Sequence, residues 1–427
     1  MAHTITGIRR FLSNIYIRMI VLIHVSSLAV KGKVSLRHYL TVLQRLEYFL
    51  RKMQENKFVS IDGKTRIALY VPGAPSRAFS TACDKFTVFN DKLPCTTVLV
   101  SITSACAFRC PHCYQKHDRG SDVQRDFLTK ALRAMQQAGI AFFNIEGGEP
   151  FMVFDRLMTV CESIDNRSEI WINSTGHGMS RKNLGELKER GVTAIMFPLH
   201  HYEKTVMNRF MGSDKAWDTI HKGIALCHEA NIPVALNMCP ERDHFYNGTF
   251  EKCMDKALDL NVAIIQIIKP KPSGGWLDGG ASLFTDDDLK QVRHKVHQYN
   301  HDRRYRHYPA ISAQVVEEDV SLFGCPAGGT DRFYLNAKGD VQPCEFLNIS
   351  FGNISREDFT SIYRRMRETF RVPCSSWLCE KYSGSIAEMF HRHQLDTLPL
   401  SEELSRRLYT RWNRGSETPL YKTLEGR

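Results

Sequence analysis

The sequence lacks the features that mark several simple protein classes. It contains no sustained short repeat and no low-complexity segment, which argues against a solenoid or a disordered chain. Its 427 residues, 43% of them apolar, are enough for one large core with appended modules. Thirteen cysteines are too sparse in so long a chain for a secreted disulfide scaffold and are better explained as metal ligands in a reducing compartment. We therefore predict a cytoplasmic protein.

An uninterrupted apolar run of membrane-spanning length is also missing. The most apolar stretch, residues 11–30, is interrupted by Asn14, Arg18 and His24. A central arginine disfavours both a transmembrane helix and a secretory signal. Two interpretations of this stretch stay open. It is either a helix packed on the main domain or a helix lying in the membrane interface, with its arginines reaching lipid phosphates.

Acidic residues are scarce near the N-terminus. Residues 1–80 contain thirteen lysines and arginines against three acids, and this excess of ten accounts for most of the net charge of +11. Such a region suits an anionic partner, either a lipid surface, an acidic peptide or a phosphorylated substrate, and we expect no nucleic acid partner. The region is predicted to contain a second amphipathic helix around residues 40–50. A hairpin over residues 58–71 then turns at Asp62-Gly63.

From residue 96 onward, strand and helix patterns alternate. Each apolar run that predicts a buried strand is followed by a helical pattern, and parallel neighbours need such crossover helices. Six units predict an α/β protein with a partial (β/α)6 TIM-like barrel, whose chemistry lies at the carboxyl ends of the strands. The predicted strands are residues 96–103, 141–146, 170–174, 194–199, 233–238 and 263–268.

The alternation is expected to stop after a helix near residues 285–300. We predict four segments on this basis. They are a basic helical and hairpin extension (1–80), the barrel core (81–310), a small cysteine- and glycine-rich module (311–390) and a C-terminal tail (391–427).

Three cysteines directly follow the first predicted strand. Cys106, Cys110 and Cys113 have the spacing Cys-x3-Cys-x2-Cys, which suits three corners of a cubic 4Fe–4S cluster and leaves one iron open. This pattern resembles the radical S-adenosylmethionine (SAM) superfamily. The resemblance implies that the open iron binds SAM, and that an electron from the cluster cleaves SAM to methionine and a 5′-deoxyadenosyl radical. The alternative is a Cys3His zinc site completed by His112 or His117.

The second predicted strand ends in Gly147-Gly148-Glu149. Paired glycines allow a ligand to approach the backbone closely, and a carboxylate accepts hydrogen bonds from an ammonium group. The segment resembles the family motif that holds the amino group of SAM. Taken alone, it would be an ordinary turn.

Four further residues are assigned to SAM by the same resemblance. Asn173 and Ser174 end the third strand, where relatives place polar groups near the SAM ribose or carboxylate. Arg209 either pairs with the SAM carboxylate or is an ordinary solvated surface residue. His112 stands where relatives usually have Tyr or Phe and would still stack near adenine.

A second set of cysteines occurs near the C-terminus. A hairpin that turns at Gly339 is predicted to bring Cys325 and Cys344 together, and Cys374 and Cys379 add a second pair. The arrangement resembles the SPASM extension of radical SAM enzymes and its shortened twitch form, which implies one auxiliary 4Fe–4S cluster. A zinc ribbon on the same four thiols is the alternative.

Cys239 differs from the other cysteines because it falls at the end of the fifth predicted strand. Some radical SAM epimerases use a thiol in this cleft to return a hydrogen atom to a substrate radical. Cys239 is therefore a candidate hydrogen-atom donor, and a buried, inert thiol is the other interpretation.

The resemblance predicts an enzyme that abstracts hydrogen from its substrate, with a flavodoxin or ferredoxin as the reductase. Peptide maturation by oxidation, epimerisation or crosslinking is the favoured activity. Modification of a lipid, cofactor precursor or other anionic small molecule at the membrane surface is the runner-up. The non-enzymatic alternatives are an iron–sulfur electron carrier and a zinc scaffold.

Overall fold

The computed structural model describes residues 2–88, 96–371 and 375–425. Its centre is a nine-stranded sheet in the order β10-β9-β8-β7-β6-β5-β4-β11-β12, in which all neighbours are parallel except β11 and β12. The strands are β4 (Thr97–Ser101), β5 (Phe142–Glu146), β6 (Glu169–Asn173), β7 (Val192–Pro198), β8 (Val234–Met238), β9 (Ile264–Ile267), β10 (Ala310–Ala313), β11 (Arg332–Leu335) and β12 (Val341–Gln342).

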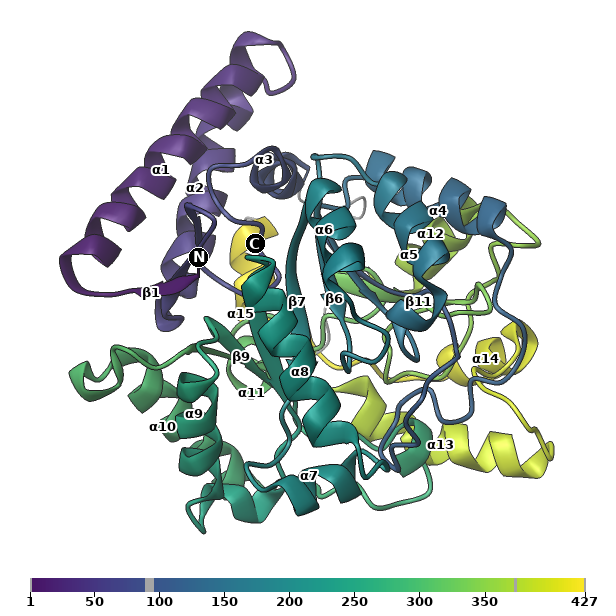
Figure 1. Ribbon diagram of the computed structural model, residues 1–427. Helices are drawn as coiled ribbons and strands as arrows, with labels where there is room; N and C mark the ends of the chain where they lie inside the picture. The colour runs from purple at the N-terminus through teal and green to yellow at the C-terminus, as the bar shows by residue number, and fades with distance from the viewer. Residues whose placement is uncertain (1, 89–95, 372–374, 426–427) are drawn as a thin grey trace.

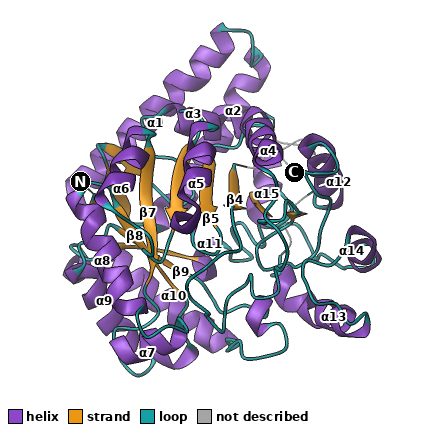
Figure 2. Ribbon diagram, turned by 45° about the vertical axis from the view of Figure 1, so that its right-hand side comes forward, coloured by secondary structure: helices purple, strands orange, loops and turns teal. Residues whose placement is uncertain are grey.

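Helices cover the outer face of this sheet (Figure 2). At least one helix follows each strand from β4 to β10, and the longer helices bury an apolar stripe, as α4 does with Leu128, Leu132 and Met135 at helical spacing. The sequential strand order with outer helices confirms the predicted α/β partial (β/α)6 barrel. The helices are α4 (Arg125–Gln137), α5 (Phe154–Glu162), α6 (Arg181–Glu189), α7 (Lys204–Phe210), α8 (Ala216–Glu229), α9 (Thr249–Asp259), α10 (Asp286–His301) and α11 (Gln314–Glu317).

The barrel sheet extends beyond the six predicted strands. The alternation does not stop after α10, because β10 follows it and pairs in parallel with β9. At the other edge, β11 of the predicted C-terminal hairpin pairs in parallel with β4. The module predicted for residues 311–390 thus shares the sheet of the core, and the four-segment division stays a prediction.

The N-terminal extension forms a helical hairpin and a small sheet. Helices α1 (Gly7–Val30) and α2 (Leu36–Lys52) project from the rest of the chain (Figure 1), and β1 (His3–Ile5) pairs with the β2 (Phe58–Ile61) and β3 (Lys64–Arg66) hairpin. The hairpin turns at Asp62-Gly63 as predicted, with both residues at positive φ. Helix α3 (Arg77–Asp84) leads on to the barrel. Helix α1 is long and apolar enough to cross a membrane, by length and composition alone. Of its most apolar 18-residue segment, 22% is buried in the protein.

The β2–β3 hairpin closes the amino end of the barrel. Val59 and Ile61 pack in one buried cluster with Phe142, Trp171 and Ala194, which lie early in the barrel strands β5, β6 and β7. This contact leaves the carboxyl ends of the strands, at the opposite side, for ligands.

Four helices follow the barrel, α12 (Phe359–Thr369), α13 (Leu378–Arg392), α14 (Glu402–Tyr409) and α15 (Pro419–Glu425). The last of them packs against the extension, because Leu420 and Leu424 share a buried cluster with Leu46 of α2. The Nε of Arg45 also donates a hydrogen bond to the main-chain oxygen of Leu424 (2.6 Å). Helix α15 therefore lies beside α2 of the N-terminal extension.

The structure also contains short 3-10 helices. They are η1 (Met53–Glu55), η2 (Lys85–Thr87), η3 (Pro150–Val153), η4 (Arg242–Phe245), η5 (Gly274–Trp276) and η6 (Arg303–Tyr305).

Candidate active site at the carboxyl ends of the strands

A cavity opens at the carboxyl ends of the barrel strands. Successive strands and the loops after them contribute its polar lining, and the C-terminal module adds Glu345 and Phe346. One lining residue comes from the extension, since Tyr70 reaches the cavity and accepts a hydrogen bond from Gln266 (2.9 Å). The strand-end residues in the lining are Glu146, Asn173, Pro198, Asn237 and Gln266.

The structure gathers Cys106, Cys110 and Cys113 in the loop between β4 and α4. Burial, together with a smaller effect of neighbouring thiols, raises the pKa of Cys110 to about 12 and that of Cys113 to about 11. Each thiol therefore lies within electrostatic reach of another. A metal cluster bound here must displace their protons, as metal ligation by cysteine generally requires.

Glycines from three other loops hold the cysteine loop in place. A Cβ on Gly148 would lie 2.1 Å from the main-chain oxygen of Ala105, one on Gly212 2.4 Å from that of Arg109, and one on Gly275 1.9 Å from that of Pro111. These distances are impossible for real atoms, so the close approach of the backbones requires glycine at each position. The loop also receives a hydrogen bond in which the nitrogen of Glu149 donates to Ala105 (2.7 Å).

The residues of the Gly147-Gly148-Glu149 segment differ in their exposure to the cavity. Gly147 and Gly148 line the cavity, whereas the carboxylate of Glu149 is fully buried. That carboxylate accepts hydrogen bonds from the hydroxyl of Ser174 (2.7 Å) and the main-chain nitrogen of Thr175 (2.7 Å). Glu149 thus joins the ends of β5 and β6, and its contact with the SAM amino group stays a prediction.

Glu146 is a cavity carboxylate that the sequence motifs did not single out. It accepts hydrogen bonds from the Tyr114 hydroxyl (2.6 Å) and from the Asn173 side-chain nitrogen (2.9 Å). Burial raises the pKa of Glu146 to about 8, against the opposing effect of these donors. The available signal was its place as the last residue of a buried strand.

The remaining predicted SAM residues take different positions. His112, Asn173 and Ser174 all line the cavity. The Nδ1 of His112 and the Oδ1 of Asn173 are buried with no hydrogen-bond partner among the described residues, so both can receive a ligand. Arg209 lies exposed on α7 outside this lining, and its role stays a prediction.

Cys239 lines the same cavity. Its main-chain nitrogen donates a hydrogen bond to Nδ1 of His200 (3.0 Å), which fixes the loop after β8 to the loop after β7. Burial raises the pKa of Cys239 to about 12, so the residue carries a neutral S–H group. A neutral S–H is the form that donates a hydrogen atom, and this role stays a prediction.

The described cysteines of the second set are buried near one another. Cys325, Cys344 and Cys379 are buried, and the thiol of Cys379 interacts electrostatically with each of the other two. Cys374 lies outside the described residues. The fourth ligand of the predicted set therefore stays a prediction.

Buried cations adjoin the second set and were not predicted. Lys271 and Lys269 line the cavity, and each ammonium group lies 2.9 Å from the carboxylate of Glu380, the residue after Cys379. Burial lowers the pKa of Lys271, but Cys379 and Glu380 outweigh burial and raise it overall. Buried lysines are rare unless paired, so this cluster links the SAM cavity to the second cysteine set.

Two family matches agree with this geometry. Residues 100–240 match the radical SAM superfamily, and residues 325–382 match an iron–sulfur cluster-binding domain, SPASM. The chain is a radical SAM enzyme with a SPASM domain. The non-enzymatic alternatives and the zinc alternatives are thereby set aside.

Similar proteins have diverse reactions. The AdoMet-dependent heme synthase of Oleidesulfovibrio alaskensis is 21% identical over 68% of this chain and 79% of its own. The PqqA peptide cyclase of Streptomyces rochei is 21% identical over 66% of this chain and 79% of its own. Among solved structures, SuiB of Streptococcus suis bound to the precursor peptide SuiA covers 67% of both chains at a TM-score of 0.53 and 14% identity, which shows the shared fold.

The cofactors are 4Fe–4S clusters and SAM, and the residues present fit them. Cys106, Cys110 and Cys113 would hold a cubane cluster and would leave one iron for SAM. Glycine backbone, a carboxylate and polar atoms without a partner among the described residues border the adjoining cavity. When bound, these cofactors supply reductive cleavage of SAM and hydrogen abstraction.

Proposed function

We propose that the substrate is a peptide or protein, which this enzyme oxidises, epimerises or crosslinks. The observation that carries the proposal is the cavity, whose lining includes Tyr70 of the extension together with residues of the strand ends and the C-terminal module. A peptide cyclase among the relatives and a peptide-bound structure of the same fold support this substrate class. Flavodoxin or ferredoxin is proposed as the reductase.

The chain's own residues orient the reacting groups. Gly147 and Gly148 let a ligand approach the backbone, and Glu146, once it is deprotonated, offers a carboxylate to a cationic group. Lys269 and Lys271 also line this cavity, and their positive charges attract acidic groups of the substrate. Cys239 is placed to return a hydrogen atom if the outcome is epimerisation.

The test uses anaerobically reconstituted enzyme, SAM, a reductant and a peptide encoded beside its gene. We expect the peptide to increase 5′-deoxyadenosine formation and to lose two hydrogens, or to gain one solvent deuterium if it is epimerised. In the second case Cys239→Ala should abolish deuterium uptake, while Cys227→Ala, a buried helix thiol outside the cavity, should retain it. A peptide-independent rate and an unchanged peptide mass would contradict the proposal for that peptide.

A second candidate function, modification of a lipid or anionic small molecule at a membrane surface, rests on α1. Its outer face exposes a continuous apolar stripe, while Arg18 on the inner side pairs with Glu47 of α2 (2.8 Å). No acidic residue precedes Glu47 in the chain, so this face suits anionic lipid headgroups. The exposed stripe includes Ile8, Phe11, Leu12, Ile15, Tyr16, Met19, Leu22 and Ile23.

Vesicle co-sedimentation tests this candidate. Full-length protein should bind vesicles that contain phosphatidylserine, and Ile23→Glu should weaken that binding. Leu283→Glu changes a similarly exposed apolar residue outside α1 and is the matched control. Equal binding of both variants, or no binding by the parent chain, would remove the membrane candidate.

A further inference from the structure

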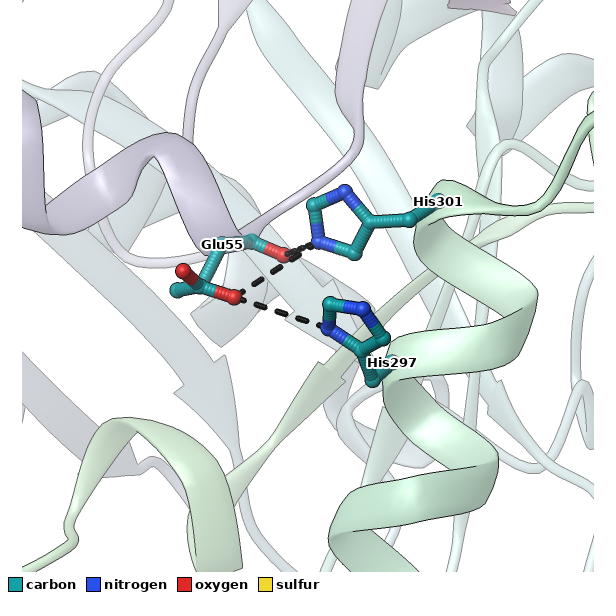
Figure 3. A group of neighbouring side chains, drawn as sticks. All are labelled: Glu55, His297 and His301. Carbon is teal, nitrogen blue, oxygen red and sulfur yellow. Dashed lines mark hydrogen bonds and ion pairs between the residues drawn. The ribbon is translucent and has the colours of Figure 1, made fainter.

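Three potential metal ligands meet at the seam between the extension and the barrel. Glu55 ends η1 directly after α2, whereas His297 and His301 belong to the last turns of α10 (Figure 3). None of the three lines the SAM cavity. The group is therefore separate from the radical SAM chemistry.

The two imidazoles are arranged to share one ion. Residues four apart lie on the same face of a helix, and the rings of His297 and His301 stack with centroids 4.4 Å apart. The Oε2 of Glu55 is 3.7 Å from Nδ1 of His297 and 3.7 Å from Nε2 of His301. Ligands of a tetrahedral zinc ion lie about 3.3 Å from one another, given metal–ligand bonds of about 2.0 Å. The Glu55 oxygen therefore needs to approach each nitrogen by only a few tenths of an ångström, and all three ligand atoms lie within 4.8 Å of one another.

The surroundings select the kind of ion. The guanidinium of Arg10 interacts electrostatically with both Glu55 and His301, and Arg293 beside the group is already paired with Asp319 (2.6 Å). This positive charge opposes any divalent cation, so binding depends on strong metal–ligand bonds. Calcium and magnesium need about six or more ligands, mostly oxygen, whereas the group supplies a single carboxylate. Two imidazole nitrogens and one carboxylate oxygen instead suit zinc, nickel or copper.

We propose that Glu55, His297 and His301 form a binding site for a divalent transition metal ion, which clamps the N-terminal extension to the barrel. The ion takes three protein ligands and leaves a position for water. Nε2 of His301 donates a hydrogen bond to the main-chain oxygen of Glu55 (2.9 Å), so coordination moves this hydrogen to Nδ1 and exchanges the contact for a metal bond.

The test is calorimetric titration of untagged, fully reconstituted protein with nickel chloride under anaerobic conditions. Filled iron–sulfur sites keep the cluster cysteines from competing for nickel. We expect one nickel ion per chain and a higher thermal midpoint in its presence. In His297→Ala the affinity should fall at least about tenfold, since losing a ligand costs more than losing a supporting residue.

His294→Ala is the matched control, because it removes another exposed imidazole of α10 outside the group. This variant should bind nickel like the parent and keep the shift in thermal midpoint. Circular dichroism checks that both variants fold. Equal nickel affinity in His297→Ala and the parent, or no binding by the parent, would overturn the proposal.

Discussion

Arg66 at the end of β3 and Glu169 at the start of β6 form an ion pair whose side chains are 1% and 4% exposed. Glu169 also accepts a hydrogen bond from the main-chain nitrogen of Gly73 (2.7 Å), and the guanidinium lies over the Trp171 ring (4.8 Å). The pair fixes the extension to the closed amino end of the barrel.

We expect Arg66→Met to lower the free energy of unfolding by about 3–5 kcal/mol, because it leaves the Glu169 carboxylate buried without its partner. Denaturant unfolding followed by circular dichroism measures the loss. Arg181→Ala, which breaks the exposed Arg181–Glu229 pair (2.7 Å), is the control and should leave the midpoint unchanged. Similar midpoints for the two variants would show that the buried pair is unimportant.

Gly148→Ala should disrupt the cysteine loop. The added methyl group would overlap the main-chain oxygen of Ala105 and push the loop away from β5. We expect lower iron content and weaker absorbance of the reconstituted protein. Gly185→Ala is the matched control, since space is open around Gly185 within α6, and it should stabilise the helix by about 1 kcal/mol with iron unchanged. Normal iron content in Gly148→Ala would contradict this account of the loop.

Glu146→Gln should remove a pH dependence of SAM binding. The raised pKa of about 8 means that Glu146 is mostly protonated at pH 7 and becomes a carboxylate as the pH rises. A carboxylate attracts the sulfonium of SAM, so the affinity of the parent should exceed that of the variant by about tenfold at pH 9 and little at pH 6.5. Anaerobic calorimetry at several pH values measures both. A constant ratio across this range would be inconsistent with titration of Glu146.

Cys325→Ser should lower the iron content by about four per chain, which is one cubane cluster, and leave the iron bound by Cys106, Cys110 and Cys113. Iron and sulfide assays after anaerobic reconstitution measure the change. Cys227→Ala serves as control and should retain all iron, because Cys227 is buried on α8 away from both sets. Full iron content in Cys325→Ser would exclude Cys325 as a ligand.

The six core strands were predictable because strands of a parallel sheet are buried on both faces and appear as continuous apolar runs. Strand β10 was not predicted because its sequence, Ala-Ile-Ser-Ala, is short and consists mostly of small residues. Its strand structure depends on its pairing with β9. The cysteine spacing predicted two sets of metal ligands, and the family matches cover both segments. Glu146 and Lys271 were missed because their roles depend on contacts with Tyr114 and Glu380, far away in the sequence.

The position of Glu149 illustrates the same limit. Its motif was visible in the sequence, but its hydrogen bonds to Ser174 and Thr175 turn the carboxylate away from the cavity lining. Local spacing therefore located the site, while the direction of each side chain required the tertiary structure.

Cys106, Cys110 and Cys113 are predicted to hold the cluster that cleaves SAM. The most direct measurement is 5′-deoxyadenosine formation by anaerobically reconstituted protein supplied with SAM and dithionite, for the parent and for Cys110→Ala. The account predicts formation by the parent and none by the variant. Equal formation by both proteins would contradict it.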